Sequence, residues 1–193
     1  MIFDKTSGVF FSHSLPRFPR KTEDNEVLAA FPSNAGIYGH TFLCISLNKK
    51  NSLKIVETLN IINPPTLLSV VSNLVQTPGN EQVLKLIKNK QDSCLSLTKI
   101  TEIASKKGNS FQIFSKSRNE ESLPYDVQIP EFHKDGLYVE TWTKPAQVPS
   151  SCIGNYQIIN VAELSFNGFN YNKNHEHSKW AVGIKKTSAD FET

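Results

Sequence analysis

The sequence is poor in cysteine and contains no long apolar run. Its three cysteines, Cys44, Cys94 and Cys152, lie far apart and lack the Cys-x-x-Cys or Cys/His spacing of a zinc site. No stretch approaches the roughly 18 apolar residues that a membrane span needs. These two absences disfavour zinc-binding modules and membrane proteins, and we expect a chain that uses no metal, no cofactor and no membrane.

The cysteine count and the first residues leave the compartment open. An odd count leaves at least one thiol without an intrachain partner, which fits a reduced cytosolic protein or a secreted protein whose partner cysteines lie elsewhere. Residues 1–5 have neither the basic region nor the apolar region of a signal peptide. We therefore expect no signal peptide in this chain.

The rest of the composition is typical of one globular domain. Of 193 residues, 38% are hydrophobic and 20% are charged, which is enough to bury a core without disulfides. The formal net charge of +3 suits an anionic partner, but it is too small to indicate nucleic acid by itself.

Apolar patterning predicts an α/β or α+β domain with a mixed sheet and flanking helices. Two helices are predicted from the stripe of apolar residues after Pro64-Pro65 and from the lysine-ended segment 81–90. Asn48 to Asn51 is predicted to end a strand. The predicted strands are residues 8–13, 37–47, a hairpin within 95–114 that turns at 106–109, 137–142 and 156–166.

Residues 175–180 read His-Glu-His-Ser-Lys-Trp and concentrate reactive side chains. If this segment is extended, His177 and Lys179 project from the same face; on a helix they would diverge by about 200°. An imidazole can attack phosphorus or transfer a proton, and an ammonium can bind a phosphate oxygen. A solvated polar turn is the alternative, because His-x-Lys is a short and common pattern.

A second histidine, His13, is predicted where a strand gives way to a loop at Pro16 and Pro19. Chemistry on a sheet is often placed at such a junction. The alternative for His13 is a partly buried histidine that backbone groups satisfy.

Four ordered segments carry a resemblance to a known family. They resemble the "HSxPxFP", "YGQxxLC", "PSxC" and "HSKW" segments of the deoxyribonuclease II family, and the similarity extends over essentially the whole chain. In this sequence the segments are residues 13–19 (HSLPRFP), 38–44 (YGHTFLC), 149–152 (PSSC) and 177–180 (HSKW).

The resemblance implies a phospholipase D-like fold in which two similar α/β halves each contribute one His-x-Lys to a single site. Residues 1–90 would be the remainder of the first half, and residues 91–193 most of the second. The implied activity is metal-independent cleavage of double-stranded DNA at acidic pH, with 3′-phosphate ends, by two histidines of which one attacks phosphorus and the other protonates the leaving oxygen. The implied location is the lysosome or the secreted fraction.

Carried over residue by residue, the resemblance assigns three positions. His177 is the implied general acid, Lys179 a phosphate clamp and His13 a supporting histidine. Arg17, Ser178 and His175 are further candidates to bind the substrate, by contacts to the DNA backbone that do not read its sequence; for Arg17 and His175 a solvated surface position is the alternative.

The departures from the family pattern keep a second hypothesis open. The family's first His-x-Lys would fall about five residues before Met1, so we expect a member that is incomplete at both ends. Gly36 and Ala181 stand where cysteines are frequent, and His40 where glutamine is usual. The chain is therefore either a nuclease or a catalytically inactive homologue that binds DNA or another protein.

Overall fold

Two units make up the chain in the computed structural model. Unit 1 consists of Met1–Ser12, Pro19–Ala29 and Leu43–Leu123, and unit 2 of His13–Phe18, Ala30–Phe42 and Pro124–Thr193. The structure describes residues 2–3, 6–16, 20–21, 23–24, 27–28, 31–33, 35–63, 97–141, 149–152, 154–172 and 177–185. The two helices predicted after Pro64 and over residues 81–90 lie outside this set, as does the predicted division at residue 90.

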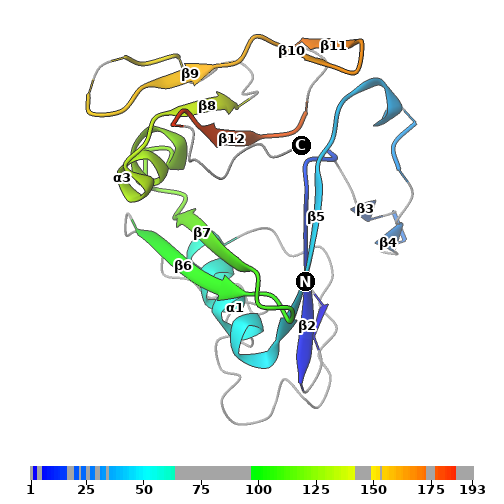
Figure 1. Cartoon of the computed structure of the whole chain (residues 1–193). Helices are drawn as coiled ribbons and strands as arrows, with labels where there is room; N and C mark the ends of the chain where they lie inside the picture. The colour runs from blue at the N-terminus through cyan, green and yellow to red at the C-terminus, as the bar shows by residue number, and fades with distance from the viewer. Residues whose placement is uncertain are drawn as a thin grey trace. The chain divides into compact units, whose positions relative to one another are not determined.

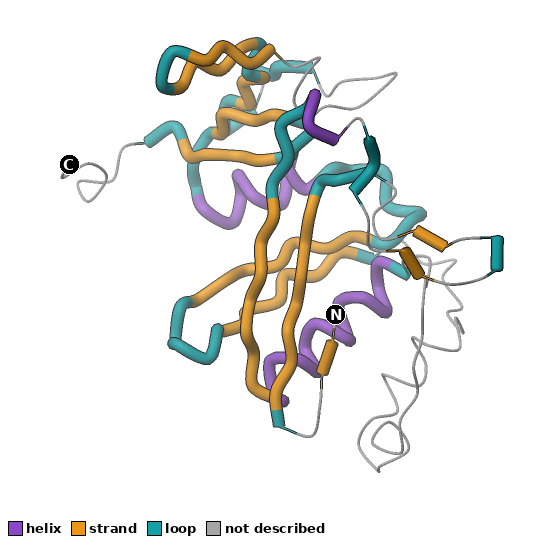
Figure 2. Tube along the Cα trace, turned by 90° about the vertical axis from the view of Figure 1, so that its right-hand side faces the viewer, coloured by secondary structure: helices purple, strands orange, loops and turns teal. Residues whose placement is uncertain are grey.

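The strands numbered up to β7 form three small sheets (Figure 1). Figure 2 shows β2 and β5 running side by side as long strands, with the short β1 at one edge. The predicted hairpin is confirmed as β6 and β7, which pair antiparallel from Thr98↔Lys116 to Ala104↔Ser110. The strands are β1 (Ile2–Phe3), β2 (Ser7–His13), β3 (Arg20–Lys21), β4 (Val27–Leu28), β5 (Phe42–Asn48), β6 (Thr98–Ala104) and β7 (Ser110–Lys116).

Helix α1 (Lys49–Ile62) follows β5 directly, where the sequence predicted only the end of a strand. Its first turn is capped because the Asn48 side chain accepts a hydrogen bond from the Asn51 backbone N–H at 2.9 Å. Asn63 ends the helix in the left-handed conformation, with φ of 48°, and donates its N–H to Leu59 O at 2.8 Å. Asparagine therefore caps this helix at both ends.

The core of unit 1 lies between this helix and four of the strands. Ile45 and Leu47 of β5, Ile55 of α1 and Ile103 of β6 are buried together. Half-buried side chains from β2, α1 and β7 complete the cluster: Phe10, Leu59, Phe111 and Ile113. Burial of this apolar surface is the main stabilising term available to the unit.

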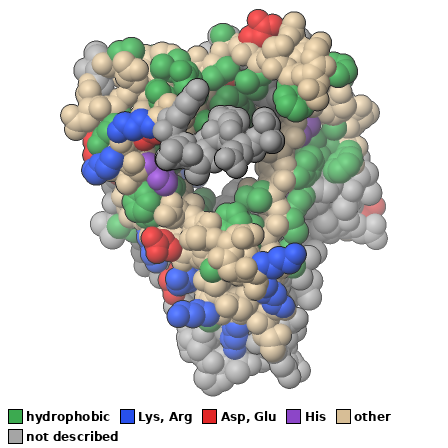
Figure 3. Space-filling view, viewed as in Figure 1, with side chains coloured by type: hydrophobic (Ala, Val, Ile, Leu, Met, Phe, Trp, Pro, Cys, Tyr) green, Lys and Arg blue, Asp and Glu red, His purple; other side chains and the backbone are tan. Residues whose placement is uncertain are grey.

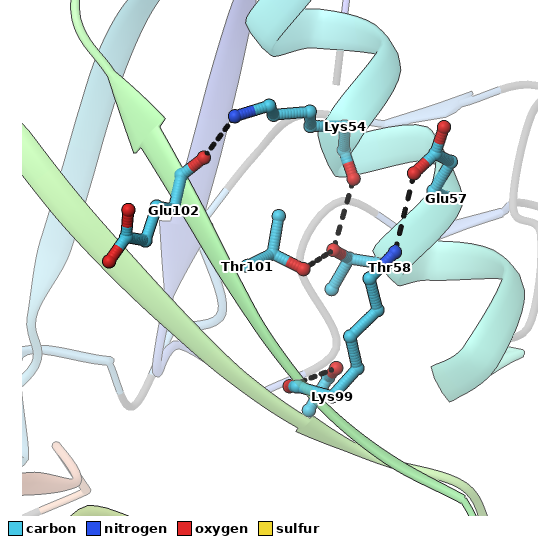
Figure 4. A network of polar contacts seen from close by, with 7 residues as sticks. Lys54, Glu57, Thr58, Lys99, Thr101 and Glu102 are labelled. Atoms are coloured by element: carbon cyan, nitrogen blue, oxygen red, sulfur yellow. Dashed lines mark hydrogen bonds and ion pairs between the residues drawn. The ribbon is translucent and has the colours of Figure 1, made fainter. Parts of the chain in front are cut away.

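A polar contact crosses the interface between α1 and β6 (Figure 4). The hydroxyl oxygens of Thr58 and Thr101 lie 3.0 Å apart, and Thr58 also donates to Lys54 O at 3.0 Å. Both threonines are buried, so neither hydroxyl can readily recover a lost partner from water.

We expect Thr58→Val to lower the free energy of unfolding by about 1–2 kcal/mol, because it leaves the Thr101 hydroxyl without this partner. The Thr58→Val/Thr101→Val double variant should lose less than the sum of the single variants, as measured by urea unfolding. Thr98→Val, at an exposed position of β6, is the control. Strict additivity of the two buried changes would contradict the coupling.

The strands from β8 onward belong to unit 2 and build a mixed sheet. Its order is β12-β8-β9, with β8 antiparallel to β12 and parallel to β9. A separate hairpin pairs β10 with β11. The remaining elements are η1 (Ala35–Ile37), η2 (Pro124–Gln128), α3 (Ile129–His133), β8 (Leu137–Glu140), β9 (Ile158–Asn160), β10 (Glu163–Phe166), β11 (Phe169–Asn172) and β12 (Trp180–Gly183).

The core of unit 2 consists of Leu137, Val139 and Ile158, with Tyr125, Ile129 and Ala181 packed against it. Burial raises the pKa of the Tyr125 phenol, so that side chain stays neutral across the physiological range. At the edge of this core, a Cβ added at Gly136 would lie 2.8 Å from Gln157 O. Glycine is therefore needed where β8 meets the chain that leads into β9.

The predicted α/β fold class with a mixed sheet is confirmed, although three strand predictions were wrong in extent. The strand predicted at 137–142 ends at Glu140 as β8, and Thr141 is not in a strand. The strand predicted at 37–47 begins only at Phe42, because the preceding turn continues into the η1 helix. The strand predicted at 156–166 is divided into β9 and β10 at Val161 and Ala162. Within the described residues, no helix is long and apolar enough to cross a membrane.

Candidate functional site

His177 lies immediately before β12 in a segment that is not a strand. Strand β12 begins at Trp180, which faces Glu140 across the antiparallel ladder with β8. The His177 side chain is nearly buried at 9% exposure, and its backbone N–H donates to Gly39 O at 2.9 Å. This hydrogen bond fixes the histidine against residues 38–40, which lie far from it in the sequence.

Two aromatic rings from that segment contact the His177 imidazole. The Tyr38 ring is stacked on it, with centroids 4.0 Å apart and planes at 11°. The His40 ring meets it edge-on, with centroids 5.3 Å apart and planes at 74°. These contacts restrict rotation of the imidazole, and the face of a tyrosine ring favours a cationic neighbour. The imidazole is therefore held in one place by its two aromatic neighbours.

His40 is itself held by Ser14. The Ser14 hydroxyl lies 3.4 Å from His40 Nδ1 and accepts a hydrogen bond from the Thr41 backbone N–H at 3.0 Å. The Ser14 backbone N–H donates to Thr41 O at 3.1 Å. One backbone–backbone and one backbone–side-chain hydrogen bond thus connect residues 14 and 41. They position His40 next to His177.

Lys179 lies close to His177 as expected, and it contacts the backbone of the histidine. Its Nζ donates to the His177 backbone carbonyl at 3.1 Å. Residues 177–179 precede β12 and are not part of a strand, and the shared face that an extended segment would give His177 and Lys179 stays a prediction. The ammonium nevertheless stays beside the histidine, on a side chain that is exposed and can reach an anion.

The other predicted site residues are placed differently. His13 ends β2 as predicted, is half-buried, and stacks on Phe42 with centroids 6.1 Å apart. Ser178 is only 3% exposed, which leaves little of its side chain for a ligand. Arg17 and His175 lie outside the described residues. The roles assigned to these four residues stay predictions.

Sequence reasoning missed three residues of the cluster and one buried carboxylate. Tyr38, His40 and Ser14 were part of the family-like segments but were given no role, since nothing local in the sequence brings them to His177. Glu140 is 3% exposed at the end of β8. A buried glutamate is rare unless it has partners, and its place opposite Trp180 puts it next to the segment that carries His177.

The chemistry available to this cluster is proton transfer and anion binding. It offers two imidazoles in contact, a fixed hydroxyl and an ammonium. Among the residues that the structure describes, no group of three or more His, Cys, Asp or Glu side chains could hold a metal ion. Cys44 and Cys152 are exposed free thiols, and Cys94 lies outside the described residues.

Comparisons with known proteins give a consistent picture. The family model described as Deoxyribonuclease II matches residues 1–190. The chain is 29% identical over 190 residues to Deoxyribonuclease-2 of Caenorhabditis elegans, covering 97% of this chain and 48% of that protein. It is 31% identical over 189 residues to Plancitoxin-1 of Acanthaster planci, covering 96% and 51%.

A third relative is Deoxyribonuclease-2-alpha of Sus scrofa, which is 28% identical over 195 residues, covering 96% of this chain and 51% of that protein. The chain thus spans about half the length of the curated relatives it matches. No solved structure matches it significantly.

Proposed function

This chain belongs to the deoxyribonuclease II family, and we propose that it forms part of an endodeoxyribonuclease that hydrolyses the DNA backbone. The proposed reaction needs no metal ion, runs at acidic pH and leaves 3′-phosphate ends. The single observation that best supports it is the contact set of His177: its imidazole is stacked on Tyr38, its backbone N–H donates to Gly39 O, and its backbone carbonyl accepts from the Lys179 ammonium. The proposed location is the lysosome or the secreted fraction.

In this proposal His177 is the general acid. It donates a proton to the 5′-oxygen as the phosphorus–oxygen bond breaks, which spares the enzyme an unstable alkoxide. The attack on phosphorus is assigned to the histidine of the family's other His-x-Lys motif. An acid of this kind must be protonated before the reaction, and an unperturbed imidazole titrates near pH 6.5. Activity should therefore decline as the pH rises above that range.

Lys179 is proposed to bind a non-bridging phosphate oxygen. Its hydrogen bond to the His177 carbonyl holds the ammonium beside the backbone of the histidine, and the side chain is exposed to solvent. A positive charge here counters the negative charge that develops on the phosphoryl group in the transition state. His13 is proposed to support the same site from the end of β2.

Lysines of unit 1 also suit a polyanionic substrate. Figure 3 shows lysine or arginine side chains at the surface near α1 and the β6–β7 hairpin, where Lys49, Lys50, Lys106 and Lys107 are exposed. Contacts of lysine with DNA phosphates do not depend on base sequence and weaken with salt. The proposed nuclease should accordingly lose affinity for DNA as the salt concentration rises.

We expect Lys179→Ala to reduce kcat/KM for plasmid nicking by roughly 10- to 100-fold, because the phosphate loses a charge-assisted donor. The assay uses the full-length protein with supercoiled plasmid in EDTA at about pH 5. Lys185→Ala is the matched control, since Lys185 is exposed just beyond β12 and bonds Lys134 O. Equal activity of Lys179→Ala and wild type would remove Lys179 from the mechanism.

The same assay decides between the nuclease and the inactive binding module. Nicking that requires the wild-type cluster supports the nuclease. DNA binding without nicking, measured by fluorescence anisotropy under the same conditions, would instead support a homologue that binds DNA without cleaving it.

A further inference from the structure

The second imidazole of the cluster has one nitrogen that its surroundings leave unused. His40 Nδ1 faces the Ser14 hydroxyl at 3.4 Å. His40 Nε2 is shielded from solvent and has no hydrogen-bond partner among the residues that the structure describes. A buried polar atom in this condition is unfavourable, and in native structures it often marks a ligand or a reacting group.

The contacts of Ser14 indicate which form His40 takes. The serine oxygen already accepts from the Thr41 N–H at 3.0 Å. Its single proton is therefore best used as a donor to His40 Nδ1, which satisfies both groups. The proton of a neutral His40 ring then lies on Nε2. A protonated ring also carries a proton there, so Nε2 is a donor in both forms.

We propose that His40 is a substrate-binding residue that donates from Nε2 to a non-bridging oxygen of a phosphate held next to His177. This inference rests on the proposed function, because that proposal makes the cluster around His177 the nuclease site. Phosphate binding is assigned here to His40, and not to Tyr38 or Ser14. The two rings are in edge-on contact, with centroids 5.3 Å apart, so a phosphate bound at His40 would lie next to His177.

The environment of Nε2 favours an anionic acceptor. An N–H that is already shielded from water has little hydration free energy to lose when it binds a ligand. Its hydrogen bond to a charged oxygen is also stronger there than in water, because the local dielectric constant is low. Titratable and charged side chains described next to the pair include Tyr38, whose ring is stacked on His177, and Lys179, whose ammonium bonds the His177 carbonyl.

The test separates phosphate binding from cleavage. Inorganic phosphate is titrated into the full-length protein at about pH 5.5, and the imidazole Cε1–H resonances are followed by NMR. We expect the His40 and His177 resonances to shift together. His40→Leu should weaken phosphate binding about tenfold, whereas His40→Gln, which retains an N–H donor, should keep most of it.

Two further variants and an activity assay complete the design. Ser14→Ala should weaken phosphate binding by less than His40→Leu, because the ring keeps Nε2 but loses its orientation. His133→Gln, at an exposed histidine of α3, is the control and should bind phosphate normally. In plasmid nicking, His40→Leu should raise KM more than it lowers kcat, and circular dichroism checks that each variant is folded.

The outcomes are distinct. Unchanged phosphate affinity in folded His40→Leu, or a His40 resonance that phosphate does not shift, would overturn the role of His40. Phosphate binding that depends on His40 in a protein that never nicks DNA would support the inference while contradicting the nuclease.

Discussion

The His177→Asn variant of the full-length protein should lose at least about a hundredfold in kcat for plasmid nicking at acidic pH. Asparagine keeps a planar polar side chain but cannot donate a proton to the leaving oxygen, and removal of a general acid typically costs 10²–10⁴-fold. The loss should appear in kcat more than in KM, because the proton is transferred only in the transition state.

His133→Asn is the control for this change. His133 lies at the end of α3 and is exposed, so the same substitution there should leave nicking unchanged. Thermal unfolding should show that His177→Asn is still folded, since the backbone hydrogen bond to Gly39 does not use the imidazole. Retention of wild-type kcat by a folded His177→Asn protein would exclude His177 as the acid.

The largest expected effect on stability comes from Leu47→Ala in β5. Leu47 is fully buried, with 0% exposure, in the cluster with Ile45, Ile55 and Ile103. Removal of three carbon atoms at such a site costs about 3–5 kcal/mol through lost burial and a residual cavity. A loss of this size is a large part of the stability of an ordinary domain.

Leu43→Ala in the same strand is the matched control. Leu43 is 46% exposed, and its truncation should cost less than about 1 kcal/mol. Urea unfolding of unit 1, followed by circular dichroism, measures the difference between the two variants. Similar midpoints for Leu43→Ala and Leu47→Ala would contradict the assignment of the core to this face of β5.

The parts of the fold that were predictable are those fixed by local sequence. The hairpin of β6 and β7 has alternating residues and a turn that includes Gly108, whose φ is 89°, so neighbouring residues determine it. Helix α1 was missed because Asn48-Lys49-Lys50-Asn51 resembles a polar turn. Its cap can be distinguished from a turn only when Ile55 and Leu59 are seen to pack on the sheet.

The candidate site was half predictable for the same reason. His177 and Lys179 are two residues apart, and their closeness was expected. Tyr38 and His40 reach His177 only through tertiary structure, by way of the Gly39 hydrogen bond and the stacked rings. No periodicity in the sequence encodes a contact of that kind. The His-x-Lys motif therefore indicated His177 as the proposed acid, but not the residues that contact its imidazole.

The hydrogen bond between His177 and Gly39 also has a consequence for the order of folding. It joins residues 138 positions apart (177 − 39), a long loop to close, and contacts of such high sequence separation form slowly. The β6–β7 hairpin and α1 can form from short segments as soon as these are made. The imidazole cluster needs the chain as far as residue 177, so it should form after the hairpin and the helix during synthesis and refolding.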